Sequence, residues 1–187
     1  IVMVDGTHVL HMATSQDHKR IGEGDTGPNT GGMGAYSPAP VVTDSVHDKV
    51  MAQVILPTVR GMAAEGHAYT GFLYAGLMID SDGNPAVIEY NCRFGDPETQ
   101  PILHRLKSDL VALCQAALDR RLDEVDAQWD PRPAVGVVLA AGGYPGSHEK
   151  GQPISGLDSD WAETTKVFHA GTESEGPQTV TAGGRVL

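Results

Sequence analysis

The sequence lacks the features that mark disulfide-rich, zinc-binding and membrane-spanning proteins. It has two cysteines in 187 residues. Cys92 and Cys114 stand far apart without a Cys-x-x-Cys motif, which argues against a disulfide scaffold and a zinc site and is typical of a reducing compartment. No apolar run approaches the roughly 20 residues of a membrane-spanning helix, and no signal peptide is visible. We therefore expect a cytoplasmic protein.

Basic residues are also few, with 13 against 24 acidic ones and a net charge of −11. An acidic protein of this kind is unsuited to nucleic acid and to anionic membranes, so we expect neither as a partner. A phosphate-binding site must then be a local basic pocket, for which Lys19, Arg20 and Arg93 are the candidates. The 40% of hydrophobic residues is enough for a packed core.

Two familiar ligand-binding loops are absent. The glycine-rich stretch Ala13–Pro40 is not closed by Gly-Lys-Ser/Thr and is not a G-x-G-x-x-G fingerprint, so it predicts a loop that is either mobile or a ligand-binding segment. Asp80–Asn84 lacks the glycine spacing and closing glutamate of an EF-hand, which favours a hairpin turn. We assign no metal to His8, His11 and His18, because no carboxylate stands at ligand spacing.

The most informative stretch present is Ala86–Gln100. Its apolar start predicts a strand, after which Glu89, Asn91 and Arg93 occupy every second position and should point the same way. Two oxygen ligands and a guanidinium suit a magnesium ion bridged to phosphate. Gly95–Glu98 then turns the chain into a helix with two further carboxylates. The alternative is a half-exposed strand whose polar face meets water.

The residues Glu89-x-Asn91-x-Arg93 resemble the metal and phosphate signature of the ATP-grasp ligases. The string Arg93–Glu98 is similar to that of the branch of this family that joins glycine to 5-phosphoribosylamine. Further strings with this resemblance are Ser15–Arg20, Asp25–Tyr36, Ala140–Pro145 and Gly183–Leu187. The resemblance covers essentially the whole chain. Because the family's enzyme is longer at both ends, we expect a C-terminal portion that is inactive in isolation.

The resemblance implies an activity. ATP, glycine and 5-phosphoribosylamine would give glycinamide ribonucleotide, ADP and phosphate through a glycyl phosphate, in purine biosynthesis. Mg²⁺ or Mn²⁺ would be held by Glu89 and Asn91. Partners would be these small molecules, with the protein a monomer or weak homodimer. A different ATP-grasp ligase for another acid and amine, or a non-catalytic fragment, remain the alternatives.

The resemblance also assigns roles to other side chains. Arg93 and Lys19 would be catalytic, and together with Arg20 they would contact ATP. The implied substrate-binding residues are Asp25, Asn29, Thr30, Gly31, Asp96 and Glu98. The strand before Glu89 offers no second metal carboxylate, so Asp80 is left out of the metal set.

The expected fold is of the α/β (α+β) class. We expect an ATP-grasp lobe over residues 1–126, with an antiparallel sheet and packed helices, and a small mostly-β domain over residues 127–187 that is truncated at its end. Apolar periodicity predicts strands around Asp5-Gly6 and over 72–79 and 85–91. It also predicts helices over 43–66, which Pro57 should kink or divide, and over 99–122 in two pieces. A shift in composition indicates a linker or boundary at 123–133, followed by short β pieces at 134–141, 153–155 and 166–170.

Overall fold

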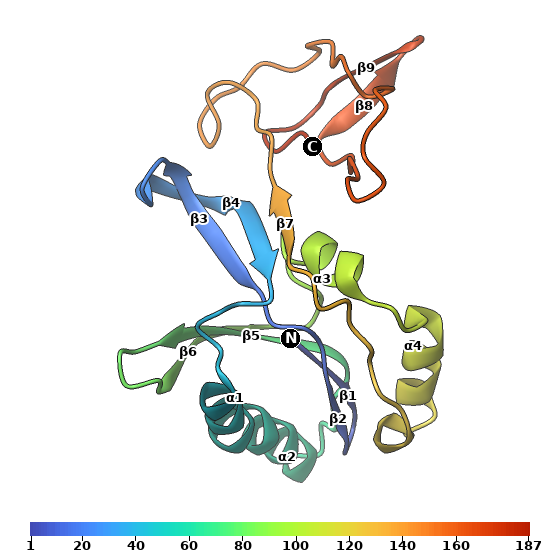
Figure 1. The fold of residues 1–187 in the computed structure, drawn as a ribbon. Coiled ribbons are helices and arrows are strands. Elements are labelled where there is room, and N and C mark those ends of the chain that lie inside the picture. The colour runs from blue at the N-terminus through green and yellow to red at the C-terminus, as the bar shows by residue number, and fades with distance from the viewer. The chain divides into compact units, whose positions relative to one another are not determined.

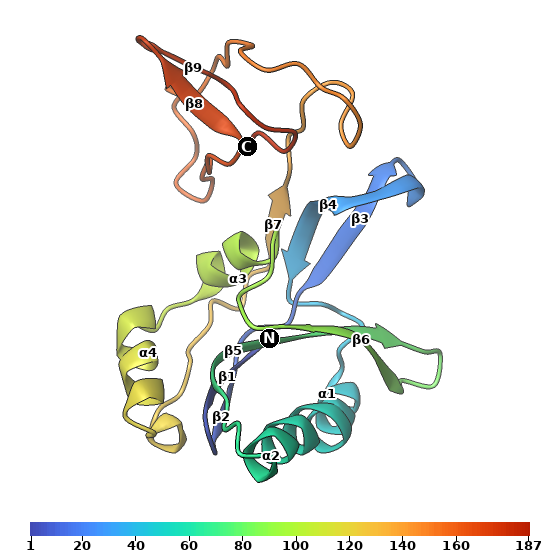
Figure 2. The same ribbon diagram turned by 180° about the vertical axis from the view of Figure 1, so that it is seen from behind.

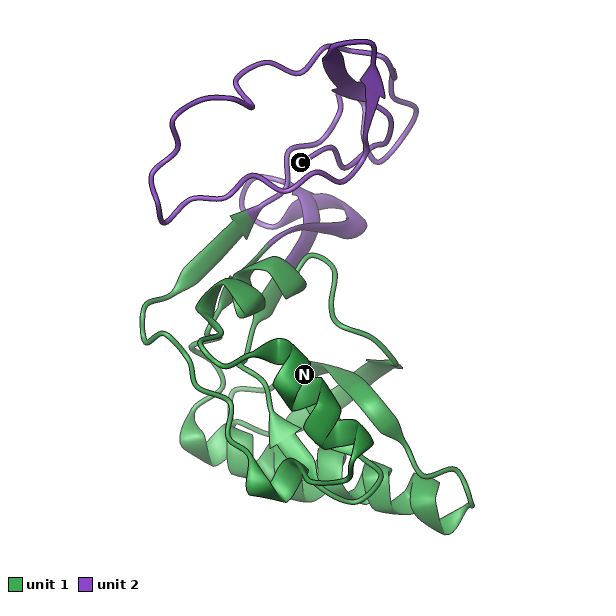
Figure 3. Cartoon of the chain, turned by 90° about the vertical axis from the view of Figure 1, so that its right-hand side faces the viewer, with its two compact units in different colours: residues 1–17, 35–136 green, residues 18–34, 137–187 purple.

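The computed structural model describes residues 1–187, which divide into two compact units (Figure 3). The first unit comprises residues 1–17 and 35–136, and the second comprises residues 18–34 and 137–187. The expected α/β class with antiparallel sheets and packed helices is confirmed. No helix combines the length and the hydrophobicity that crossing a bilayer requires.

The first unit contains a four-stranded sheet in the order β2-β1-β5-β6. Its strands are β1 (Val2–Asp5), β2 (Val9–His11), β5 (Thr70–Ile79) and β6 (Pro85–Asn91), and each neighbouring pair is antiparallel. All four residues of β1 are buried. Because side chains alternate along a strand, β1 supplies apolar groups to both faces of the sheet.

One face of this sheet packs against a helical stretch made of α1 (Asp44–Val50), a π-helical turn η1 (Met51–Ile55) and α2 (Leu56–Ala64). Figure 1 shows α1 and α2 along the inside of the curved sheet. The core here joins side chains of β1 and β5 to the helices; its buried members are Val2, Val4, Val54, Ile55, Val59 and Leu73. The helical backbone runs without a break from α1 to α2, so the kink or division expected at Pro57 takes the form of the π-helical turn just before it. Proline at the start of α2 lacks the N–H that a continuing α-helix needs.

The opposite face packs against α4 (Leu110–Leu118), as the view from behind also shows (Figure 2). Met3 and Leu10 contact a helical surface that includes Leu113, Ala116 and the 3-10 turn η2 (Leu122–Glu124). The preceding helix is α3 (Thr99–Arg105). The sequence restarts a helix at α4 because Asp109 caps it, with its carboxylate accepting the Val111 N–H at 2.8 Å.

The expectation of a loop over Ala13–Pro40 is wrong, because a hairpin takes up most of this stretch. Strands β3 (Gln16–Gly22) and β4 (Thr26–Ser37) belong to a sheet of order β3-β4-β7, with β7 at Ala134–Val137. Three residues, Glu23–Asp25, connect the strands, and Gly24 and Asp25 turn the chain with positive φ of 69° and 59°. The strands carry no apolar alternation, so hydrophobic periodicity misses them.

The end of the chain contains a second hairpin, β8 (Thr172–Glu175) and β9 (Gln178–Thr181). The β pieces expected at 153–155 and 166–170 are wrong: Pro153 makes one isolated bridge to Val180, and residues 166–170 form no strand. The piece expected at 134–141 is a strand only over β7. The strand β8 was missed because its Thr-Glu-Ser-Glu sequence is polar and exposed.

Asp5 fixes the first hairpin at the point where β1 ends. Its fully buried carboxylate accepts N–H groups from Thr7 (3.0 Å), His8 (2.7 Å) and Leu122 (3.2 Å), and it bonds the His8 ring at 3.0 Å. Burial alone would raise the pKa of Asp5, but these bonds outweigh it and lower the pKa from 3.8 to about 2. One buried charge therefore joins the hairpin to the 3-10 turn η2.

Asp5→Asn is expected to lower the free energy of unfolding at neutral pH by about 2–4 kcal/mol, because the new amide NH₂ faces N–H donors. The folded pKa lies below the unfolded one, so the carboxylate's stabilisation is complete above 3.8 and is lost as the pH falls toward about 2. Urea unfolding should thus show a large difference between variant and parent at neutral pH and a small one near pH 2.

The matched control is Asp80→Asn. Asp80 accepts the N–H groups of Asp82 and Asn84 in the same manner, but in an exposed turn where water can replace them. Asp80→Asn should lower the free energy of unfolding clearly less than Asp5→Asn does. Equal losses at the two positions, or an Asp5 effect that does not change with pH, would contradict the assignment.

Candidate functional site

The first group of candidate residues lies at the end of β6. Glu89 stands opposite Gly76 of β5, and Asn91 stands opposite Tyr74. The Asn91 side-chain nitrogen lies 3.4 Å from Oε1 of Glu89, and both side chains are at least partly exposed. The two side chains therefore share one side of the strand, as their spacing predicts, and their polar ends meet.

A bulge and a glycine prepare the position of Glu89. The register shifts between Gly76 and Leu77, so that Ile88 is an extra residue on β6, and such bulges re-aim side chains. A Cβ atom at position 76 would lie 3.2 Å from Cγ of Glu89. The absence of a side chain at Gly76 thus leaves the space that the Glu89 side chain occupies.

Arg93 lies beyond the strand. Strand β6 ends at Asn91 and Arg93 stands in a bend, so the strand alternation that predicts a common side for the three residues does not extend to Arg93. Its exposed guanidinium donates from Nη1 to the Phe94 carbonyl at 2.8 Å. This bond uses one of the five N–H groups of the guanidinium.

Glu98 and Asp96 follow in the turn that leads into α3, and they differ in exposure. Asp96 is exposed, whereas Glu98 is 2% exposed. The Tyr74 hydroxyl donates to Oε1 of Glu98 at 2.5 Å, and the buried Oε2 has no hydrogen-bond partner. A Cβ at Gly95 would overlap the Glu98 carboxylate, so the turn depends on glycine at this position.

Tyr74 stands among acidic groups. Its burial, its bond to Glu98 and the nearby charges of Asp17 and Glu89 together raise the pKa of Tyr74 above its usual range. The hydroxyl therefore keeps its proton and acts as the donor to Glu98. The sequence did not single out Tyr74 or Gly76, because their importance comes from the strand register, which no local motif encodes.

The second group of candidates belongs to the hairpin in the second unit. Lys19 and Arg20 are exposed on β3, and Asp25 is in the turn at its tip. Asn29 and Thr30 follow on β4, where the Thr30 hydroxyl donates to the Lys19 carbonyl at 2.7 Å. The structure thus brings Lys19 and Thr30 together within this unit.

Gly31, the remaining candidate on β4, contacts two residues to which the sequence assigned no role. Its N–H donates to the Tyr144 hydroxyl at 3.1 Å, and its carbonyl accepts from Nη1 of Arg185 at 2.9 Å. Both residues lie in glycine-containing strings, Gly142-Gly143-Tyr144-Pro145 and Gly183-Gly184-Arg185. The glycines in these strings were the sequence signal that pointed to Tyr144 and Arg185.

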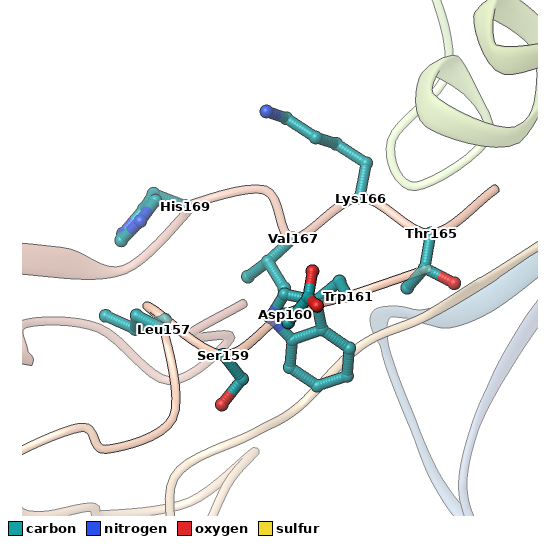
Figure 4. A pocket seen from close by; sticks show the side chains of 8 residues that line it. All are labelled: Leu157, Ser159, Asp160, Trp161, Thr165, Lys166, Val167 and His169. Atoms are coloured by element: carbon teal, nitrogen blue, oxygen red, sulfur yellow. The ribbon is translucent and has the colours of Figure 1, made fainter. Parts of the chain in front are cut away.

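A hollow of about 490 Å³ in the second unit contains none of the candidate residues. Figure 4 shows its lining, in which the Lys166 side chain extends away from the indole of Trp161. The lining residues are Leu157, Ser159, Asp160, Trp161, Thr165, Lys166, Val167 and His169. We assign no function to this hollow.

Residues 1–99 match the family model of the phosphoribosylglycinamide synthetase ATP-grasp (A) domain, and residues 134–187 match that of the C domain of the same family. The whole chain is 73% identical to a phosphoribosylamine–glycine ligase of Vibrio cholerae and 69% identical to one of Pseudomonas syringae. It covers 44% and 43% of those proteins. The chain therefore spans less than half the length of these curated relatives.

Two solved structures show the same fold. A crystal structure of a phosphoribosylamine–glycine ligase from Thermotoga maritima aligns with a TM-score of 0.83 and 38% identity, over 99% of this chain and 45% of that one. An L-amino acid ligase from Bacillus licheniformis aligns with a TM-score of 0.50 and 14% identity, over 98% and 47% of the two chains. The second likeness concerns the fold alone.

Tyr74→Phe is expected to lower the free energy of unfolding by about 1.5–3 kcal/mol, because it leaves a buried carboxylate without its hydrogen-bond donor. Tyr90→Phe is the matched control. Its hydroxyl bonds Thr58 at 2.7 Å, but Tyr90 is 41% exposed and water can replace it, so the loss should stay below about 0.5 kcal/mol. Urea unfolding compares the two variants, and similar losses would argue against a buried Tyr74–Glu98 bond.

Proposed function

The chain belongs to the phosphoribosylglycinamide synthetase family, and on that premise we propose that it is part of an ATP-dependent ligase that joins glycine to 5-phosphoribosylamine. The products are glycinamide ribonucleotide, ADP and phosphate, formed through a glycyl phosphate in purine biosynthesis. The names of the similar proteins support this proposal. The partners are small molecules, and we propose neither nucleic acid nor a membrane as a partner.

The observation that carries the proposal is the meeting of Glu89 and Asn91 at the end of β6, 3.4 Å apart. A carboxylate and an amide are hard oxygen donors of the kind that Mg²⁺ or Mn²⁺ accepts, and such an ion takes few protein ligands beside phosphates and water. The amide nitrogen and oxygen of Asn91 exchange places by a simple flip, so its oxygen can face an ion. A bound ion supplies charge neutralisation for the phosphates of ATP.

The chain's cationic side chains would act on the transferred phosphoryl group. Arg93 is exposed and bonds only the neighbouring Phe94 carbonyl, so its guanidinium can turn toward phosphate oxygens. We propose that it holds two of these oxygens at once, where charge develops in the transition state. Lys19 and Arg20 are proposed to contact the phosphates of ATP from the hairpin.

The acidic and polar candidates are proposed to orient the amine substrates. Asp25, Asn29 and Asp96 are exposed and able to meet a ligand. Because Glu98 is buried, it is proposed to contribute indirectly, by supporting the turn that carries Asp96. Thr30 and Gly31 complete the proposed substrate-binding set.

We also propose the division into a C-terminal part of an ATP-grasp domain over residues 1–126 and a small mostly-β domain over residues 127–187. The family models support it, since one matches residues 1–99 and the other matches residues 134–187. Both parts would belong to one enzyme.

The experiment that tests the proposed substrate measures ADP release by a full-length protein that carries this chain, with 5-phosphoribosylamine present. Release should depend on glycine and should be absent with other amino acids. Release with a different acid instead of glycine would assign the chain to another ATP-grasp ligase, and no amino-acid-dependent release would refute the proposed ligase activity.

Glu89→Ala in that full-length protein is expected to lower kcat by roughly a hundredfold or more, because a metal with few protein ligands loses its charged one. The control is Glu173→Ala, which removes an exposed glutamate from β8 and should leave kcat unchanged. Steady-state kinetics at limiting Mg²⁺ provides the comparison. Near-parental activity of the Glu89 variant would rule out the metal assignment.

Arg93→Lys keeps the positive charge but loses the planar fork of donors. We expect kcat to fall roughly a hundredfold, equivalent to about 2–4 kcal/mol, with a smaller change in the KM for ATP. The control is Arg60→Lys at an exposed position of α2, which should have no effect. If Arg93→Lys stayed within about threefold of the parent, Arg93 would be a surface residue without a role in the transition state.

A further inference from the structure

Two side chains near the end of the chain hold the Gly31 peptide of β4 from both sides. We name Tyr144 and Arg185 the Gly31 clamp. The Tyr144 hydroxyl accepts the Gly31 N–H at 3.1 Å, while Nη1 of Arg185 donates to the Gly31 carbonyl at 2.9 Å and reaches the Gly32 carbonyl at 3.4 Å. The clamp residues stand 113 and 154 positions further along the sequence.

The clamp fits closely because two glycines leave room for it. A Cβ at Gly31 would lie 3.0 Å from Cζ and Nη2 of Arg185, and a Cβ at Gly184 would overlap the Tyr144 ring. Neither glycine has a left-handed φ. These two positions therefore need glycine because the clamp residues approach so closely, and not because the backbone adopts a conformation that only glycine tolerates.

Backbone pairing holds the two clamp residues side by side. The Ala141 N–H donates to the Gly184 carbonyl at 2.8 Å, and the Val186 N–H donates to the Leu139 carbonyl at 2.8 Å. These bonds join the segment that leads to Tyr144 with the segment that carries Arg185. The clamp is thus built from two paired pieces of chain and not from flexible tails.

The effect of the clamp extends from Gly31 to the proposed phosphate-binding side chain. The Thr30 hydroxyl accepts the Gly32 N–H at 3.0 Å and donates to the Lys19 carbonyl at 2.7 Å. Fixing the Gly31 peptide therefore fixes Thr30, and Thr30 fixes the backbone of Lys19. Lys19 and Asn29 are exposed along this hairpin, where they can meet a ligand.

We propose that Tyr144 and Arg185 are positioning residues, which hold the Gly31 peptide and, through Thr30, the backbone of Lys19 in the arrangement in which Lys19 receives the phosphates of ATP. The inference rests on the proposed function, in which this hairpin contacts ATP. A clamp that served packing alone would contribute to stability and leave nucleotide affinity unchanged. The two roles therefore differ in a measurable quantity.

The test compares variants of a full-length protein that carries this chain, using binding of a non-hydrolysable ATP analogue with Mg²⁺, measured by titration calorimetry. Tyr144→Phe removes only the hydroxyl, and Arg185→Lys removes the guanidinium, whose Nη1 reaches both carbonyls. Each should raise the Kd about three- to tenfold, the size expected from one lost hydrogen bond. Because both residues act on one peptide, the double variant should fall short of the product of the single effects.

The matched control is Thr172→Val, which removes a side-chain bond between Thr172 and His169 in the same unit. It should leave the Kd unchanged, and the thermal midpoints of the three single variants should lie close together. Unchanged Kd values in both clamp variants would overturn the proposal, as would a rise in Kd that only follows a loss of stability. This readout is independent of ligase activity, so a failure of glycine-dependent ADP release would refute the proposed function separately.

Discussion

The antiparallel pairing of β5 with β6 is the constraint on which the first candidate group depends. It sets Glu89 opposite Gly76 and Asn91 opposite Tyr74. The glycine leaves space for the Glu89 side chain, while the tyrosine donates to Glu98 in the turn that follows. A shift of the register by one residue would turn each of these side chains to the other face of the sheet. One ladder of backbone bonds thus sets the proposed metal-binding pair and supports the turn after it.

Glycines in this protein often serve close approach and not only chain reversal. Gly76 makes room for a carboxylate side chain, Gly95 makes room for the buried Glu98, and Gly31 lets a guanidinium lie against its backbone. In each case a side chain with a proposed role occupies the volume that a Cβ would fill. Some of the 23 glycines of the sequence are therefore explained by close packing of other side chains against them. Composition alone would assign them to loops.

Apolar periodicity was sufficient for the elements that build the core. It predicted the helices and the strand 72–79, because burial imposes a pattern there. It also predicted the strand 85–91 from its apolar run, although that strand is largely exposed. It failed for Ala13–Pro40 and for β8, because these strands lack apolar alternation and are stabilised by pairing that no local pattern records. The roles of Tyr74 and Arg185 were also out of reach, since each depends on a partner that is distant in sequence. The alternation that placed Glu89 and Asn91 on one side does not extend to Arg93, because the strand ends at Asn91.

The most direct test of the proposed metal site is anomalous diffraction from crystals of a full-length protein that carries this chain, grown with Mn²⁺ and a non-hydrolysable ATP analogue. The account predicts an anomalous peak within coordinating distance of the Glu89 carboxylate and the Asn91 side-chain oxygen, with phosphate oxygens of the analogue in the same coordination shell. A metal peak that neither side chain contacts, with the phosphates bound beside it, would contradict the account.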